Sequence, residues 1–251
     1  MKKALKKGRR AHGHNGRNYS CNRTTDLSEV TSNDVWQSKP KGSCKVDEKT
    51  KREGEGLIEL KGGSWLFNKG KTENDKDAKG VGFLIHQKLK DYIKKVKSYS
   101  NRVVSLSMQL AAKEHICVIQ AYVPTNDYDD SVIEEFYEDI DKAIKENHGK
   151  YTVLMGDFNA KLGKCEAGEE LTLGTFGIGQ RNRRGERLTE FAVEQKLIIT
   201  NKLFKKNKKR YWKWESPNGL TKNQIDFIMT SQRGIVKNCE VITTVDIVSD
   251  H

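Results

Sequence analysis

Residues 151–163 read YTVLMGDFNAKLG and stand at the centre of the predicted domain. The first five are mostly apolar or β-branched, which indicates a buried strand, and Gly156 ends the run. Asp157 and Asn159 follow two positions apart, and side chains with that spacing on an extended chain point to the same side. Both would leave the strand end together, where open α/β sheets bind ligands. The alternative is an ordinary turn, which favours Asp and Asn for its own hydrogen bonds.

The charge balance favours a polyanionic partner. The chain has 251 residues, which suits one large α/β domain with a tail or two small domains. Its 46 Lys and Arg outnumber 34 Asp and Glu, for a formal net charge of +12. Such an excess favours nucleic acid or an anionic surface, although lysine-rich surfaces also serve solubility alone. We expect no membrane partner, because no apolar run approaches the roughly 18 residues of a membrane span, and we expect a monomer.

Targeting and cysteine patterns indicate a protein that stays inside the cell. The basic N-terminus has no apolar segment behind it, so it does not read as a secretory signal. Five cysteines share no C-x-x-C spacing, which fits free thiols in a reducing compartment and gives no zinc site. We expect a nuclear location, with the cytoplasm as the alternative.

Residues 1–56 differ from the rest of the chain. They hold 14 Lys and Arg against 7 Asp and Glu, and 12 apolar residues without a helical or strand period. Such a segment buries too little surface to offset its ordering entropy, so we expect most of it to be disordered or degenerate. Its basic cluster at residues 2–10 is either a nuclear-import or phosphate-binding patch or a solvated tail. The ordered domain would span residues 57–251.

The rest of the chain is rich in strands. Apolar runs predict strands at residues 57–60, 65–67, 81–85, 103–110, 115–123, 151–155, 197–200, 211–214, 224–229 and 239–245. Apolar residues with a 3.6 period predict helices at 87–96, 132–144 and 186–195. A glycine-rich loop at 166–185 is too long for a plain connection. Strands outnumber helices, so the expected fold class is α+β, built on two packed sheets.

Four separated strings place polar groups at the ends of, or inside, apolar strands. They are AYVPT (121–125), GDFN (156–159), NQID (223–226) and SDH (249–251). Each alone is weak, since Tyr122 also suits a core and Asp226 also suits a solitary strand end. Their order and residue types resemble the endonuclease/exonuclease/phosphatase superfamily of metal-dependent phosphodiesterases, in which such groups surround one phosphate.

A closer resemblance covers residues 57–251. The strings LIELKGGSWLFNKG, FGIGQRNRRGERLTEFA, RYWKWESPNG and VDIVSDH are similar to the endonuclease domain of RTE-type LINE retrotransposons and to the domesticated craniofacial development protein 2 family. This resemblance implies a DNase I-like, four-layer α/β sandwich of two packed mixed β-sheets flanked by helices. It also implies a Mg²⁺-dependent nick in a DNA strand, with Mn²⁺ as the other candidate cofactor.

The residue types suit such chemistry. Asp157, Asp226 and Asp250 would crowd one pocket, where two carboxylates ~4 Å apart repel by roughly 4 kcal/mol at an effective dielectric of about 20. A divalent cation or a protonated histidine removes that repulsion, and oxygen ligands without cysteine favour Mg²⁺ or Mn²⁺ over zinc. The resemblance implies that Asp157 positions and deprotonates the attacking water, while Asn159 and Tyr122 hold phosphate oxygens. It also implies that Asp226 orients His251, which donates to the phosphate. Asp250 would bind the metal.

Basic and aromatic residues around this pocket are candidate DNA contacts. Cationic side chains neutralise phosphates, and two tryptophans separated by one residue share a strand face that suits base stacking or groove insertion. Packing inside the sheet is the alternative for the tryptophans. The candidates are Arg181, Asn182, Arg183, Arg184, Lys205, Lys206, Lys208, Lys209, Arg210, Trp212 and Trp214.

The resemblance is incomplete at both ends of the chain. The family has an asparagine in a T-W-N-V-R strand, which only Asn22 approaches here. Its metal-binding glutamate falls on Lys49, and the nearest substitutes are Glu48, one residue off, and Glu29. The family also continues beyond Asp-His into a last strand, which this chain lacks. We therefore expect incomplete N-terminal and C-terminal strands, with the domain truncated at its C-terminus.

Two function classes stay open. The first is a retrotransposon-derived, Mg²⁺-dependent DNA endonuclease, either active or impaired. The second is an inactive domesticated relative that keeps the fold and binds nucleic acid or protein. A phosphodiesterase for lipid or inositol phosphates is a third class, which the basic surface and the paired tryptophans disfavour.

Overall fold

The structure is a computed structural model of the chain, and it describes residues 54–70, 80–124, 128–147, 149–206, 214–215 and 222–240. The expectations for residues 1–53 and 241–251 lie outside this range, as does most of the predicted strand at 211–214.

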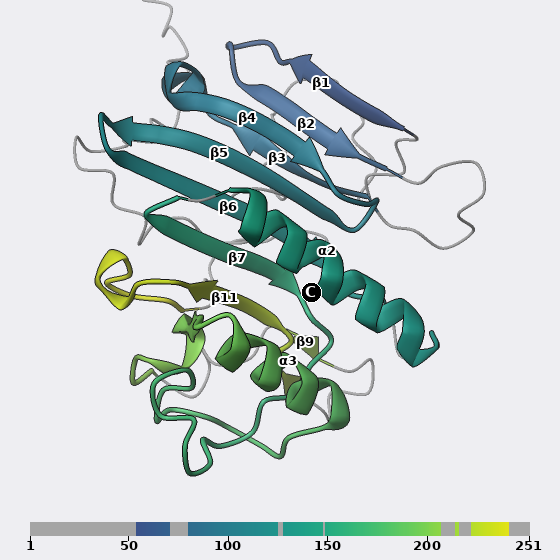
Figure 1. Cartoon of the computed structure of the whole chain (residues 1–251), viewed down its shortest axis with the longest axis vertical. Coiled ribbons are helices and arrows are strands. Elements are labelled where there is room, and N and C mark those ends of the chain that lie inside the picture. The colour runs from purple at the N-terminus through teal and green to yellow at the C-terminus, as the bar shows by residue number, and fades with distance from the viewer. Residues whose placement is uncertain are drawn as a thin grey trace, which may run out of the picture.

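Two packed β-sheets hold nine of the eleven described strands (Figure 1). The smaller is antiparallel, in the order β1 (Glu55–Glu59), β2 (Trp65–Lys69), β3 (Val81–Ile85). The larger is mixed, in the order β4-β5-β6-β7-β11-β8, and its strands β5 and β6 contact β3. This confirms the α+β fold of two packed sheets. The remaining strands are β4 (Ile93–Ser98), β5 (Val103–Ala111), β6 (Glu114–Tyr122), β7 (Tyr151–Asp157), β8 (Ile198–Ile199), β11 (Asp226–Thr230), and a separate antiparallel pair, β9 (Trp214–Glu215) with β10 (Lys222–Asn223).

Strands β6 and β7 are parallel, so their C-terminal ends lie at the same end of the larger sheet. Parallel neighbours need a crossover connection, and α2 (Asp130–Glu146) supplies it. The apolar residues of α2 recur at spacings of three and four, so the helix buries one stripe against the sheet. The buried residues are Ile133, Phe136, Tyr137, Ile140 and Ala143.

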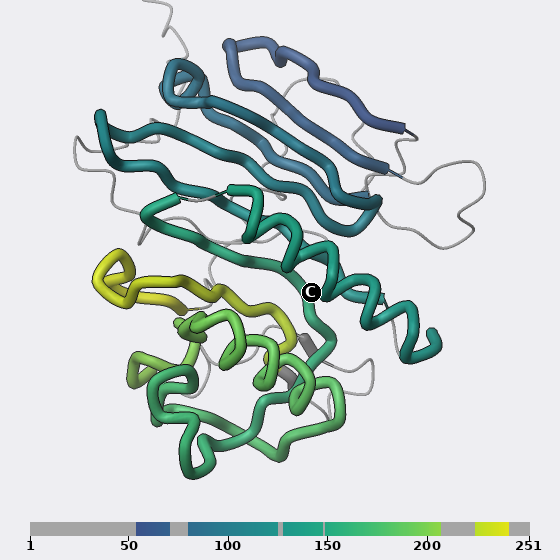
Figure 2. The backbone as a smooth tube through the Cα atoms, viewed as in Figure 1, coloured from purple at the N-terminus to yellow at the C-terminus, as the bar shows by residue number. Residues whose placement is uncertain are grey.

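The second long helix, α3 (Arg183–Glu194), lies beside α2 on the same face of the larger sheet (Figure 1). It buries Leu188, Phe191 and Ala192. The ring centroid of Phe191 lies 4.9 Å from that of Tyr137, which joins the two helices. A long loop without a helix connects β7 to α3 (Figure 2).

Strand alternation divides the side chains of the larger sheet between two cores. On β6, Ile116 and Val118 belong to the core between the two sheets, whereas Cys117 and Ile119 belong to the core beneath the helices. Successive strand side chains point to opposite faces of the sheet. Even-numbered residues of this part of β6 therefore face one core, and odd-numbered residues face the other.

The helix predicted at residues 87–96 is wrong. Gln87–Tyr92 form a 3₁₀ turn and Ile93–Ser98 form β4. The register shifts between Ile93 and Lys95, as at a β-bulge, and Ile93 and Val96 both pack on the core between the sheets. An extra residue in a strand thus imitates the three-residue spacing of a helix. The other predicted helices, at 132–144 and 186–195, correspond to α2 and α3.

Candidate active site at the ends of β6, β7 and β11

Three neighbouring strands bring three of the predicted site residues into one row. Asp157 at the end of β7 lies directly opposite Asp226 at the start of β11. On its other side, Asp157 is in register with Tyr122 at the end of β6. Residues in register point to the same face of a sheet, with β-carbons about 4.5–5.5 Å apart. All three residues are half-buried, so the row is partly open to solvent at this end of the sheet.

The row lies on the face of the larger sheet that meets the smaller sheet. Tyr122 packs against the core between the sheets, and so does Ile228, two residues after Asp226. On β7, Val153 and Met155 are buried in the same core, and Asp157 continues their alternation. The candidate site is therefore the place where the inter-sheet core ends and polar residues begin.

The backbone around Asp157 is held tightly between two neighbouring strands. The Val123 N–H donates to the Asp157 carbonyl (3.0 Å), and the Phe158 N–H donates to the Ile225 carbonyl (2.9 Å). The Phe158 side chain is buried beneath the helices, with its ring centroid 6.4 Å from that of Phe136. These contacts fix where the Asp157 side chain begins.

Asn159 does not continue the extended chain. Its φ of 46° lies in the left-handed region, which residues other than glycine seldom adopt. Its N–H donates to Oδ1 of Asp157 (2.9 Å), which orients the carboxylate. The local hydrogen bond of an ordinary turn is thus present at the end of β7. The expectation that Asp157 and Asn159 share a side assumed an extended backbone, and that assumption is wrong at this residue.

Asn201 is a positioning residue that sequence reasoning missed. Its side chain donates to the Asp226 carbonyl (3.2 Å) and accepts the Ile228 N–H (2.8 Å), while Thr200 donates to the Ile228 carbonyl (2.8 Å). Since β8 has only two residues, these side chains continue its pairing along the outer edge of β11. The only signal in the sequence is a polar Thr-Asn pair after a short apolar run.

Two of the predicted DNA contacts hold the protein together instead. The Arg181 side chain is 9% exposed and donates to both carboxylate oxygens of Glu169, and also to the carbonyls of Leu162 and Lys164. Its hydrogen bonds lower the pKa of Glu169. Asn182 caps α3 by accepting the Gly185 N–H, and its side-chain oxygen also accepts the Lys161 N–H from the segment after β7. These hydrogen bonds tie the loop before α3 to the rest of the protein.

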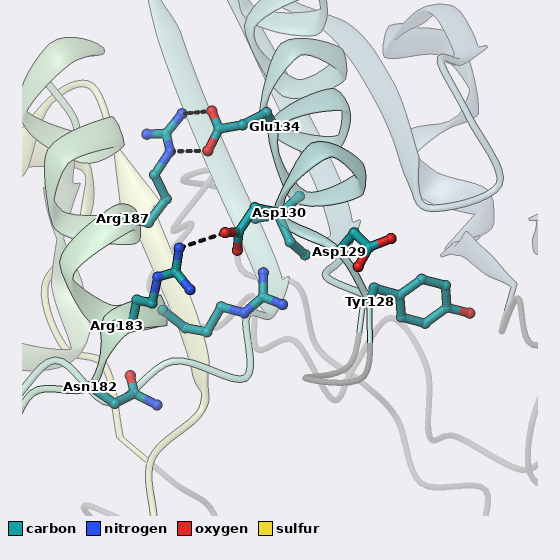
Figure 3. Close-up of a pocket in the computed structure, with 9 residues that line it drawn as sticks. Tyr128, Asp129, Asp130, Glu134, Asn182, Arg183 and Arg187 are labelled. Atoms are coloured by element: carbon teal, nitrogen blue, oxygen red, sulfur yellow. Dashed lines mark hydrogen bonds and ion pairs between the residues drawn. The ribbon is translucent and has the colours of Figure 1, made fainter.

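A cleft of about 740 Å³ lies between the N-terminal ends of α2 and α3 (Figure 3). Arg183 pairs with Asp130 across it, and Arg187 makes two hydrogen bonds of 2.8 Å to Glu134. Arg184 also lines the cleft and has no ion pair with any residue in the described part of the chain. We call this feature the arginine cleft; its remaining lining residues are Tyr128, Asp129, Ile133 and Asn182.

The arginine cleft and the row of Tyr122, Asp157 and Asp226 lie at the same end of the larger sheet. The chain leaves β6 after Tyr122 and enters α2 at Asp130. The start of α3 is tied to the segment leaving β7, because Asn182 exchanges two hydrogen bonds with the backbone of Lys161. Both walls of the cleft are therefore fixed to strands that end in the row.

The other predicted site residues divide by position. Lys205 is exposed, whereas Lys206 is half-buried and donates to the Asn201 carbonyl (2.8 Å), and burial lowers its pKa. Trp214 contributes its backbone to β9. The residues that lie outside the described range are Asn22, Glu29, Glu48, Lys49, Lys208, Lys209, Arg210, Trp212, Asp250 and His251.

The row suits a cation that keeps most of its own water. Among the described residues, no three acidic, histidine or cysteine side chains gather where one ion could bind them. Mg²⁺ commonly binds through one or two carboxylates, with water and phosphate as its other ligands. Asp157 and Asp226 supply two carboxylates from adjacent strands, so the residues present fit such an ion.

No helix in the described ranges is long and apolar enough to cross a membrane.

The family comparison defines the class of protein: this is an endonuclease/exonuclease/phosphatase-type domain built on two packed sheets. Residues 116–251, more than half of the chain, match the endonuclease–reverse transcriptase family, and the chain belongs to that family.

Curated relatives of the chain include craniofacial development protein 2 from Bos taurus, 34% identical over 176 residues, and its counterpart from Tragulus javanicus, 33% identical. Each match covers 68% of this chain, but the chain spans only 29% and 30% of the length of these relatives.

Similar solved structures include truncated Caenorhabditis elegans TDP2, with a TM-score of 0.40, 10% identity, and coverage of 67% of this chain and 61% of that one. An endonuclease/exonuclease/phosphatase family protein from Leptotrichia buccalis has a TM-score of 0.36 and 15% identity, with coverage of 69% and 62%.

Proposed function

We propose that this chain is a retrotransposon-derived, Mg²⁺-dependent DNA endonuclease domain that hydrolyses a phosphodiester bond. The observation that carries the proposal is the row of Tyr122, Asp157 and Asp226 in register on three adjacent strands. Membership of the endonuclease–reverse transcriptase family supports the reaction class. A nuclear location and a monomeric state belong to the same proposal, as does a domain spanning residues 57–251.

In this proposal the row performs the hydrolysis around one phosphate. Asp157, oriented by the Asn159 N–H, accepts the proton of the attacking water. The Tyr122 hydroxyl and the Asn159 amide donate to phosphate oxygens, where charge builds up in the transition state. Asp226 orients His251, which donates to the same phosphate, and Asp250 adds a carboxylate. A bound Mg²⁺ supplies charge neutralisation and makes its bound water more acidic.

A second candidate function is DNA binding without hydrolysis, and Lys49 favours it. By resemblance, Lys49 stands where the family has its metal-binding glutamate. At ~4 Å and an effective dielectric of about 20, an ammonium and a divalent cation repel by roughly 8 kcal/mol, an upper value because lysine can swing into water. This repulsion would slow nicking without preventing DNA binding.

The conversion of supercoiled plasmid to its open-circular form in Mg²⁺ tests the proposed function. We expect little nicking by the unmodified chain and faster nicking by Lys49→Glu. The matched control, Lys51→Glu, makes the same charge change two residues away and should leave the rate unchanged. If Lys49→Glu still does not nick while DNA binding persists, the binding-only function is the correct one.

DNA binding should weaken steeply with salt, because cations that neutralise phosphates release counterions. Each phosphate contact contributes about −0.9 to the slope of log affinity against log salt concentration. Arg184→Gln should make the slope shallower by about 0.9, since Arg184 lines the arginine cleft without an ion pair among the described residues. Fluorescence anisotropy with a labelled duplex measures the slope. An affinity that hardly changes between low and moderate salt would contradict this prediction.

A further inference from the structure

Arg102 lies beside the row but belongs to none of the sequence motifs. It follows β4 and immediately precedes β5, and its carbonyl accepts the Tyr122 N–H (3.0 Å). Its guanidinium carbon lies 5.7 Å from the ring centroid of Tyr122 and 5.2 Å from that of Tyr128. Both distances are within the roughly 6 Å of a cation–π contact. Arg102 is therefore held between a residue of the row and a residue that lines the arginine cleft.

The Arg102 guanidinium has no anionic partner within the described residues. Arg181, Arg183 and Arg187 each pair with a carboxylate. Arg102 makes no hydrogen bond or ion pair through its side chain with any described residue, and it is half-buried. Contacts with ring faces use the charge of a guanidinium but not its N–H groups. Its N–H donors consequently stay available for a planar anion such as a phosphate.

We propose that Arg102 binds a backbone phosphate of the DNA strand next to the phosphate held by the row. The strand then runs from the row, past Tyr128, into the arginine cleft. This inference rests on the proposed function, because it takes the row as the position of the cleaved phosphate. The proposal follows from the two ring contacts, which place the Arg102 cation between the row and the arginine cleft.

The salt dependence of DNA binding separates this role from a purely structural one. A residue that only packs the two tyrosines would lower stability or affinity on removal and leave the salt slope unchanged. A residue that neutralises a phosphate contributes about −0.9 to the slope, which is roughly eightfold in affinity per decade of salt. Two variants separate the effect of the charge from the effect of the side chain's shape. Arg102→Lys keeps the positive charge, whereas Arg102→Gln removes it.

The experiment measures binding of the full chain to a fluorescein-labelled 20-base-pair duplex by anisotropy, in EDTA and across a series of salt concentrations. We expect Arg102→Gln to make the slope shallower by about 0.9 and to weaken binding at 0.1 M salt by roughly eightfold. Arg102→Lys should keep the original slope. The control is Arg233→Gln, an exposed arginine in the turn that follows β11 at the end far from Asp226, and it should match the unmodified chain.

Two results would overturn the proposal, and they are distinguishable. If Arg102→Gln keeps the slope while Arg184→Gln makes it shallower, DNA binding stands and Arg102 has only a packing role. If the unmodified chain shows no salt-dependent affinity for the duplex, both the strand path and the proposed function fail.

Discussion

Replacing Asp157 by asparagine in the Lys49→Glu background should reduce Mg²⁺-dependent plasmid nicking by roughly 10²–10⁴-fold, the usual contribution of a positioned general base. Asparagine keeps the shape of the side chain and an oxygen that can accept the Asn159 N–H. It loses the negative charge and the ability to take a proton. The turn at the end of β7 should therefore survive while the chemistry is lost.

The same variant should be stabilised less by Mg²⁺ in thermal unfolding. A ligand at ten times its Kd stabilises the folded state by about 1.4 kcal/mol, which is roughly 3–6 °C in a domain of this size. Removing one of the two facing carboxylates should shrink that shift. Since unfolding does not depend on turnover, this measurement detects metal binding even where nicking is too slow to follow.

The control for both measurements is Asp91→Asn, which neutralises an exposed aspartate in the 3₁₀ turn before β4. It should nick at the parent rate and keep the Mg²⁺ shift. If Asp157→Asn nicks as fast as its parent, the row of Tyr122, Asp157 and Asp226 is not the active site, and the proposed function loses its main support.

The central strand and its polar end were within reach of sequence reasoning because both follow local rules. An apolar run stopped by glycine predicts a buried strand, and β7 covers it. The pairing of Asp157 with Asp226 joins residues far apart in the chain, and no local pattern specifies such a register. Only the resemblance to a known family suggested that these residues meet.

The sequence could not reveal which charged residues the fold uses for itself. Arg181 and Arg184 stand three positions apart in one basic string, yet Arg181 is paired with Glu169 while Arg184 lines the arginine cleft. Arg102 shows the converse, because it lies in no motif and its position depends on contacts with two tyrosines. Charge alone does not distinguish a structural arginine from one that faces a ligand, since the partners come from elsewhere in the chain.

Gly156 is the residue of the GDFN string whose role is purely steric. Its φ is 151°, and a β-carbon built on it would lie 1.8 Å from the Ala121 carbonyl oxygen and 2.8 Å from the carbonyl carbon. Both atoms belong to the backbone of β6, a central strand that is paired on both sides. Neither can move aside unless β6 and β7 separate. Only glycine permits the close approach that sets Tyr122 beside Asp157.

We expect Gly156→Ala to destabilise the fold by about 4–5 kcal/mol, the upper range for single substitutions. Whole domains have about 5–15 kcal/mol of stability, so the variant should melt roughly 8–20 °C lower, or fail to fold. The matched control is Gly234→Ala, where a β-carbon would meet nothing within 4 Å and the change should stay within about 0.5 kcal/mol. Thermal unfolding of the two variants measures the difference. A Gly156→Ala protein that melts like the parent would mean that β6 and β7 do not approach this closely, and that the spacing of the row is different.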